Sequence, residues 1–152
     1  MSSPTAIHEA THAQVAMDLG LTVRRLQVRG WVRVPRYCAQ LYPGLVRGVP
    51  VRSPICLLEE DCLDTDPFAV LVAMAAPSFL ATDDEKVNAY AGLEAMLAYR
   101  WASKNGIRQD RVRTRAYQYA SICEPDIYAL ASRLEQEGRI DGHQLPMSEL
   151  SG

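Results

Sequence analysis

The sequence predicts one α+β domain that is mostly helical and carries a small β-sheet near its N-terminus. Helix-start signals predict the helices: a capping residue precedes a proline at Ser3-Pro4 and again at Asp66-Pro67, and Thr82 to Glu85 form a capping box. Residues 21 to 51 are rich in β-branched side chains in alternating patterns, which is typical of strands. A length of 152 residues suits a single domain with its own core.

The elements are expected in a definite order along the chain. They are a helix at 4–19, two to four short strands within 21–51 (one of them at 37–41), an acidic connector at 57–66, a buried helix from 67, a long helix from the capping box to 105–106, and helices at 110–122 and from there to Gly138 after a break at Glu124-Pro125. The domain is expected to cover residues 1–146, followed by a disordered tail at 147–152.

Charge and hydropathy narrow the class of partner. The formal charge of -2 gives no basic surface of the kind that binding to nucleic acid or to an anionic membrane needs. No apolar stretch approaches the roughly 20 residues that span a bilayer, and the first residues lack the pattern of a signal peptide. We therefore expect a cytoplasmic protein with no nucleic-acid or membrane partner. Its four cysteines, at irregular spacings, are expected to be free and mostly buried thiols.

His8-Glu9-Ala10-Thr11-His12 is an H-E-x-x-H motif inside the first predicted helix. Residues four apart lie on one face of a helix, so both imidazoles can reach a single zinc ion. Glu9 follows His8 around the helix, which puts its carboxylate beside the ion, where it can take a proton from a bound water. The motif predicts His8 and His12 as metal ligands and Glu9 as the general base. The alternative is a chance occurrence on a solvated helix.

A catalytic zinc ion needs a third protein ligand and an open position for water. His143, the remaining histidine, lies in a polar stretch and is most simply a surface turn residue, so carboxylates are the candidates. Acids in a first helical turn also favour the positive end of the helix, which by itself explains a cluster at that place. The candidates form one cluster at the start of the long helix (Asp83, Asp84 and Glu85) and one in the connector (Glu59, Glu60, Asp61, Asp64 and Asp66).

Several segments resemble the peptidase domain of FtsH-type metalloproteases. Residues 5–13 resemble that family's A-x-H-E-A-G-H-A helix, and residues 23–30 resemble the strand that follows it. Residues 73–77 fall where the family has a small-residue helix, and the segments at 127–131 and 138–142 resemble its closing helix and turn. The resemblance covers most of the chain and implies a zincin-like fold.

The resemblance also implies the third ligand and the activity. Asp83 to Val87 is similar to an N-D-x-x-x-A segment of the family, whose aspartate binds zinc, and this implies Asp84 as the ligand with His8 and His12. The protein would then be a zinc-dependent hydrolase, a metallopeptidase with Zn²⁺ as cofactor. Thr11 stands where the family has glycine, and Pro77-Ser78-Phe79 also departs from it. These residues show no counterpart of the family's ATPase module or membrane anchors, so we expect a peptide substrate to be short, already unfolded or delivered by a partner.

Three readings of the function follow. A peptidase would bind an extended peptide along the strand at 37–41, if that strand is a sheet edge and not an ordinary hairpin strand. A metal-dependent enzyme of the same fold could instead act on a small molecule without proteolysis, which a narrow and closed pocket would favour. A non-catalytic interaction module, as a homo-oligomer for example, would lack the metal. Five arginines between Arg24 and Arg36 either attract an acidic substrate or are solvated strand residues.

Overall fold

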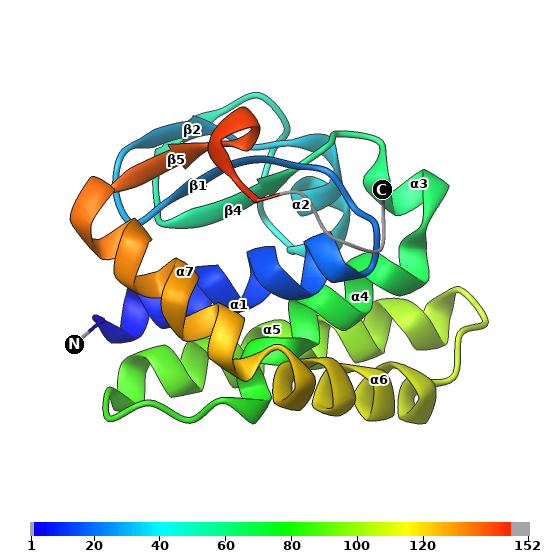
Figure 1. Ribbon diagram of the computed structural model, residues 1–152. Helices are drawn as coiled ribbons and strands as arrows, with labels where there is room; N and C mark the ends of the chain where they lie inside the picture. Colours follow the sequence, from blue (N-terminus) through cyan, green and yellow to red (C-terminus); the bar gives the residue numbers. More distant parts are fainter. Residues whose placement is uncertain (1, 147–152) are drawn as a thin grey trace.

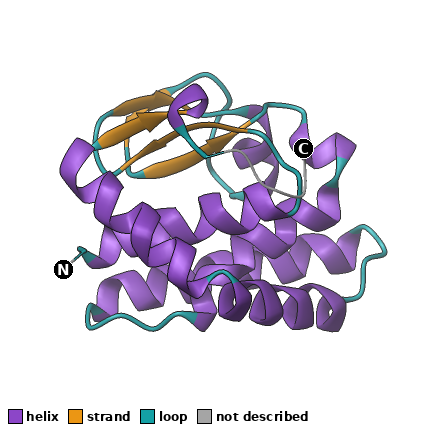
Figure 2. Ribbon diagram, in the orientation of Figure 1, coloured by secondary structure: helices purple, strands orange, loops and turns teal. Residues whose placement is uncertain are grey.

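In the computed structural model, which describes residues 2–146, small β-sheets cover one side of a layered set of helices (Figures 1 and 2). The helices are α1 (Pro4–Asp18), α2 (Arg36–Leu41), α3 (Cys62–Thr65), α4 (Pro67–Ala75), α5 (Glu85–Lys104), α6 (Gln109–Ile122) and α7 (Glu124–Glu137), with 3-10 turns at Ala76–Phe79 and Gly142–Gln144. The strands are β1 (Val23–Gln27), β2 (Trp31–Arg33), β3 (Pro50–Arg52), β4 (Ile55–Leu58) and β5 (Arg139–Asp141). A mostly helical α+β class is confirmed.

Helix α1 carries the H-E-x-x-H residues through the interior of the molecule. The Ser3 hydroxyl caps its N-terminus by accepting a hydrogen bond from the Ala6 amide, and Gly20 follows its end with a φ of 86°. Every residue from His8 to Met17 is buried, because α1 packs against α7 and α4 on some sides and against β1 and β4 on another. The motif therefore does not lie on a solvated helix.

The main sheet has the antiparallel order β4-β1-β5. In the central strand, Leu26 lies opposite Cys56 of β4 and Ile140 of β5. Strands β2 and β3 form a separate antiparallel pair. The sequence predicted a sheet near the N-terminus alone. The observed sheet also includes β5, which comes from near the other end of the chain. Residues 57 and 58, expected in the acidic connector, instead complete β4, the strand that ends the sheet on one side.

The prediction of a strand at 37–41 is wrong, because these residues form helix α2. Pro35 precedes the helix with extended backbone, and Tyr37 and Leu41 are its buried residues. They are four residues apart, which places them on one face of a helix, whereas the same short apolar run also fits the period of a strand. The sheet edge expected at this place is therefore absent from the described residues.

The other helices are confirmed within a few residues of their predicted bounds. Asp66 and Pro67 start α4, with the Asp66 carboxylate accepting from the Ala69 amide. Helix α5 begins after Asp84, so Asp84 and not Thr82 is its capping residue. Pro125 separates α6 from α7, where it occupies the first turn. The disordered tail predicted at 147–152 lies outside the described residues.

Small side chains allow the helices to approach closely in the core. Alanines supply much of the buried surface of α1, α4 and α5, and larger apolar residues such as Leu26, Leu71 and Ile127 fill the space between the layers. All four cysteines are free thiols, three of them buried. None of the described helices combines the length and the apolar composition needed to cross a bilayer.

Candidate metal centre

Two imidazoles project from one face of α1 towards a common point. His8 and His12 are one helical turn apart, and their Nε2 atoms lie 3.2 Å from each other. Both residues are buried, with 5% and 8% of their surface exposed. Two imidazole nitrogens whose lone pairs face each other repel, so an approach this close needs either a hydrogen on one of the nitrogens or a metal ion between them.

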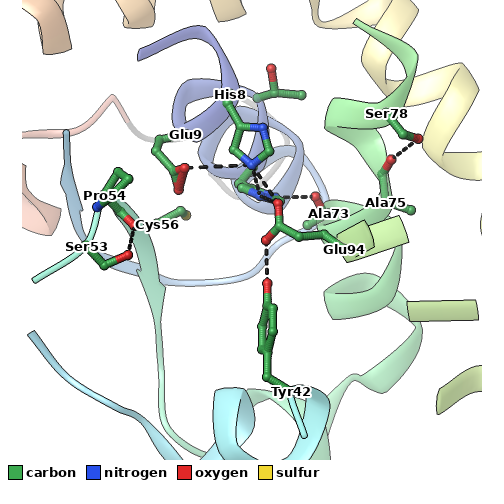
Figure 3. A network of polar contacts seen from close by, with 12 residues as sticks. His8, Glu9, Tyr42, Ser53, Pro54, Cys56, Ala73, Ala75, Ser78 and Glu94 are labelled. Atoms are coloured by element: carbon green, nitrogen blue, oxygen red, sulfur yellow. Dashed lines mark hydrogen bonds and ion pairs between the residues drawn. The ribbon is translucent and has the colours of Figure 1, made fainter. Parts of the chain in front are cut away.

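Glu94, from α5, supplies a carboxylate to the same point. Its Oε1 atom lies 2.6 Å from the His8 Nε2 atom and 3.1 Å from the His12 Nε2 atom. The ligand-type atoms of the three residues all lie within 4.8 Å of one another, and all three residues are buried. Figure 3 shows Glu94 directed at the His8 imidazole from the neighbouring helix. We call His8, His12 and Glu94 the metal cluster.

Further hydrogen bonds orient these side chains. The His12 Nδ1 atom lies 2.8 Å from the Ala73 carbonyl oxygen of α4, to which it donates, and this turns Nε2 towards Glu94. The Tyr42 hydroxyl, just beyond the end of α2, donates to the other Glu94 oxygen, Oε2 (Figure 3). Metal-binding histidines and carboxylates in proteins typically have such outer partners, which fix the direction of the coordinating atom.

Two of the three distances in the cluster are close to those between ligand atoms of a tetrahedral zinc site. Bonds of roughly 2.0–2.1 Å place neighbouring ligand atoms roughly 3.3 Å apart. The His8–His12 and His12–Glu94 separations are 3.2 Å and 3.1 Å, whereas the 2.6 Å separation of His8 and Glu94 would have to lengthen. Two histidines and one glutamate are a donor set found in catalytic zinc sites, which keep the fourth position for water or substrate.

At this cluster, proton binding would compete with the binding of a metal ion. Burial alone lowers the pKa of His12, but the Glu94 carboxylate, assisted by Glu9, outweighs burial and raises it to about 9. Burial also raises the pKa of Glu94, and there His12 and His8 outweigh it, so the pKa of Glu94 falls below its usual value. A metal ion needs the neutral imidazole, so it must displace the proton that His12 holds at neutral pH.

Glu9 lies beside the cluster without joining it. Its Oε2 atom is 3.8 Å from the His8 Nε2 atom, and Figure 3 shows Glu9 and Glu94 on different sides of the His8 ring. Burial raises the pKa of Glu9, and the opposing effects of His12 and His8 reduce that rise without cancelling it. A carboxylate with a raised pKa beside a candidate metal site suits proton transfer at neutral pH.

A cavity of about 120 Å³ lies next to Glu9, His12 and Glu94. It is close in size to a cavity of about 150 Å³ that holds benzene and far below the roughly 300–1,000 Å³ of sites that enclose drug-sized ligands. Tyr90, half-exposed on α5, forms part of its wall, with its ring 5.8 Å from that of His8. The rest of the lining is mainly apolar and includes Val32, Val34, Tyr37, Leu41, Val51, Ile55, Cys56, Val70 and Met74.

The structure places Asp84, which the resemblance implies as the third ligand, outside the cluster. Its carboxylate accepts hydrogen bonds from the Lys86 and Val87 amides at the start of α5. Glu94 lies ten residues further along the same helix, about 15 Å at 1.5 Å per residue. Asp84 therefore caps the first turn of α5, whereas the carboxylate that meets the two histidines is that of Glu94, further along the same helix.

The other predicted candidates also lie outside the cluster. Glu60 pairs with Arg47, Asp64 pairs with Arg36, and Asp66 caps α4, so these connector acids have structural partners at the surface. Exposed His143 lies in the 3-10 turn at Gly142–Gln144, in agreement with the predicted surface turn. The metal cluster and Glu9 thus come from α1 and α5 alone.

A sequence signal for Glu94 exists in the pattern of α5. Alanines at 91, 95, 98 and 102 form the buried face of this helix, and Glu94 is buried with them. Glutamate is almost never fully buried without a charged or metal partner, so an acid on an otherwise apolar helical face is a candidate ligand.

Comparisons with known proteins identify no relative of this chain. No protein-family model matches the chain, no curated protein matches it, and no solved structure matches its fold. The functional argument therefore depends on the site itself.

Proposed function

We propose that this protein is a metal-dependent hydrolase in which His8, His12 and Glu94 hold a zinc ion and Glu9 is the general base. The convergence of two Nε2 atoms and one carboxylate oxygen on a single buried point carries the proposal. Such a group is costly to bury unless a cation compensates it. Its donor set also matches that of known catalytic zinc sites.

The chain's own residues would divide the reaction between them. Zinc supplies positive charge that polarises a substrate carbonyl and makes water more acidic. Glu9 takes a proton from the attacking water as the water oxygen bonds to the carbonyl carbon. It then passes that proton to the leaving nitrogen as the carbon–nitrogen bond breaks. The products are a carboxylic acid and an amine, and Glu9 returns to its starting state.

A peptide is the first candidate substrate. The H-E-x-x-H helix followed by a strand resembles the FtsH-type peptidase domain, with a zincin-like fold implied, and the bond broken there is an amide. In this form the protein is a metallopeptidase for short or unfolded peptides. The position of Glu94 departs from the aspartate that the resemblance implies.

A small-molecule amide is the second candidate, and a specific observation favours it. The cavity beside Glu9 measures about 120 Å³ and is walled by apolar side chains. The strand expected at 37–41 as a peptide-binding edge is helix α2, which forms part of that wall. A non-proteolytic reaction on a small substrate fits such a pocket better than cleavage within a long chain.

Metal analysis with matched variants tests the reaction class. We expect about one zinc per chain in the purified protein, lost in Glu94→Gln and kept in Asp84→Asn and Glu9→Gln. Hydrolysis of amide substrates should fall 10²- to 10⁴-fold in Glu9→Gln, the range typical of a lost general base. A protein that binds no added zinc would be an interaction module, and zinc that stays bound in Glu94→Gln would refute the assigned ligand set.

A further inference from the structure

We propose that Tyr37 closes the edge of β4 to peptide strands and so restricts the reaction to small amides whose acyl group enters the cavity. The inference rests on the proposed function and specifies its substrate class. Tyr37 is then a specificity-determining residue that acts by excluding extended chains.

Strand β4 is the sheet edge nearest to Glu9. It ends the β4-β1-β5 sheet on one side, with β1 as its only neighbour in that sheet. Ile55, Cys56 and Leu58 of β4 line the same cavity as Glu9, which places this strand beside the proposed general base. A peptide that paired with β4 would therefore pass the reacting centre, which is how an extended substrate would be presented.

The Tyr37 hydroxyl already occupies this edge. It accepts a hydrogen bond from the Leu58 amide at 2.9 Å and donates to the Cys56 carbonyl oxygen at 3.3 Å. Backbone groups of alternate residues face the same side of a strand, so these two groups are among those that an added antiparallel strand would use. One phenol therefore occupies two of the main-chain groups with which a substrate strand would pair.

Helix α2 is anchored at both ends, which makes the closure firm. Tyr37 is 5% exposed and lies near the start of the helix, and Tyr42, just after it, donates to Glu94. A peptide could reach β4 only by displacing the phenol of Tyr37 and the helix that carries it. That displacement would leave buried polar groups without partners until the peptide had paired with them.

The cavity defines what remains admissible. Its volume of about 120 Å³ and mainly apolar lining suit a small apolar acyl group, about the size of a benzene ring, with Glu9, His12 and Glu94 as polar lining residues. The substrate class is therefore a small amide with an apolar acyl group. Water is the co-reactant, and the products are the short carboxylic acid and the free amine.

A comparison of substrate sizes tests the role of Tyr37. With zinc-loaded protein, kcat/KM is measured for a butyryl amide of a fluorescent amine and for a quenched decapeptide library. We expect the wild type to favour the small amide at least tenfold. The ratio of decapeptide to small-amide kcat/KM should rise at least tenfold in Tyr37→Phe and further in Tyr37→Ala, and stay unchanged in Tyr99→Phe, a tyrosine outside the cavity wall.

Two readouts independent of turnover accompany this comparison. Hydrogen exchange of the Leu58 amide should be faster in Tyr37→Phe than in the wild type, because the acceptor of that amide is gone. Fluorescence anisotropy compares two proteins that cannot cleave the peptide, Glu9→Gln and the double variant Glu9→Gln/Tyr37→Ala. A fluorescently labelled decapeptide should bind the double variant and not Glu9→Gln alone.

The outcomes separate the two proposals. Efficient decapeptide cleavage by the wild type overturns the role of Tyr37, as does an unchanged ratio in Tyr37→Phe despite faster Leu58 exchange. If a Tyr37 variant does not fold, the wild type alone tests the proposal: a preference of at least tenfold for the small amide supports it, and a smaller preference overturns it. If neither substrate is hydrolysed, the proposed function fails, and peptide binding by Tyr37→Ala then decides the closure of β4 by itself.

Discussion

At the scale of single residues, the centre depends on side chains that are themselves held by others. Glu94 offers one oxygen to the imidazoles and accepts from Tyr42 with the other, and His12 is fixed by the Ala73 carbonyl. Each coordinating atom thus has a defined direction before a metal ion binds. Such preorganisation raises affinity because little conformational freedom remains to be lost.

Tyr42→Phe tests this orientation. The variant removes the hydroxyl that donates to Glu94 and leaves the ring, so zinc affinity should fall about 10- to 100-fold, the usual effect of losing an outer partner. Competition titration against a chromophoric chelator measures it. Tyr99→Phe is the matched control, and an affinity equal in both variants would show that Tyr42 does not orient the ligand.

The pH dependence of stability tests the charge on His12. Its pKa is raised from 6.5 to about 9 in the folded protein, so the folded state holds a proton that the unfolded state releases between those values. This contribution is complete below pH 6.5 and is lost as pH rises through about 9. The free energy of unfolding of the zinc-free protein, measured with denaturant, should therefore fall across this window by at most about 3 kcal/mol.

Glu94→Gln provides the control for that pH dependence. It removes the carboxylate that is the main cause of the raised pKa, so the loss of stability between pH 6.5 and 9 should largely disappear. A wild-type stability that stays flat over the same range would mean that His12 is neutral throughout.

At the scale of elements, α1 and α5 meet because small residues line both. The buried face of α5 consists of alanines and Glu94, and α1 contributes Ala6, Ala10 and Ala13 to the core. The same helix α5 has a second acid, Asp84, whose place at its first turn is that of a cap. The two acids of α5 thus differ in position: Asp84 caps the start of the helix, whereas Glu94, the candidate ligand, lies on its buried face.

Asp84→Ala distinguishes these two roles. Loss of the cap should lower the free energy of unfolding by about 1 kcal/mol, because the Lys86 and Val87 amides lose their acceptor. Zinc content and amide hydrolysis should remain as in the wild type. Loss of bound zinc in a folded Asp84→Ala protein would restore the ligand that the family resemblance implies.

At the scale of the whole molecule, a bound ion would join the two helices that carry the site. The ligands come from α1, which is central to the core, and from α5, which lies on the other side of the site. An unfolded chain brings residues 8 and 94 together only rarely, so binding to the folded state is strongly preferred. Zinc should therefore act as a stabiliser of the entire fold.

Thermal unfolding with and without chelator measures this linkage. At a free zinc concentration of about 100 times Kd, the gain should be about 2.7 kcal/mol, or roughly 5–11 °C in Tm for a chain of this length. Glu94→Gln should show little or no shift, whereas Asp84→Asn should respond like the wild type. A shift that is equal in all three proteins would indicate binding elsewhere.

The sequence by itself determined the features that depend on short-range order. Capping residues and prolines predicted the starts of α1 and α4, and the capping box predicted α5 to within a few residues. The spacing of His8 and His12 predicted that they share a helical face, and this is how they lie. These predictions succeed because each depends on residues within one or two turns of the chain.

Only the tertiary structure decided the features that depend on distant contacts. Residues 37–41 fit a strand or a helix locally, and packing of Tyr37 and Leu41 against the core selected the helix. Strand β5 forms only because β1 offers it an edge. Glu94 and not Asp84 faces the histidines, because Glu94 lies on the face of α5 that is buried against α1, whereas Asp84 caps the start of the helix. His8 and Glu94 are 86 residues apart in the sequence, so local patterns could not pair them.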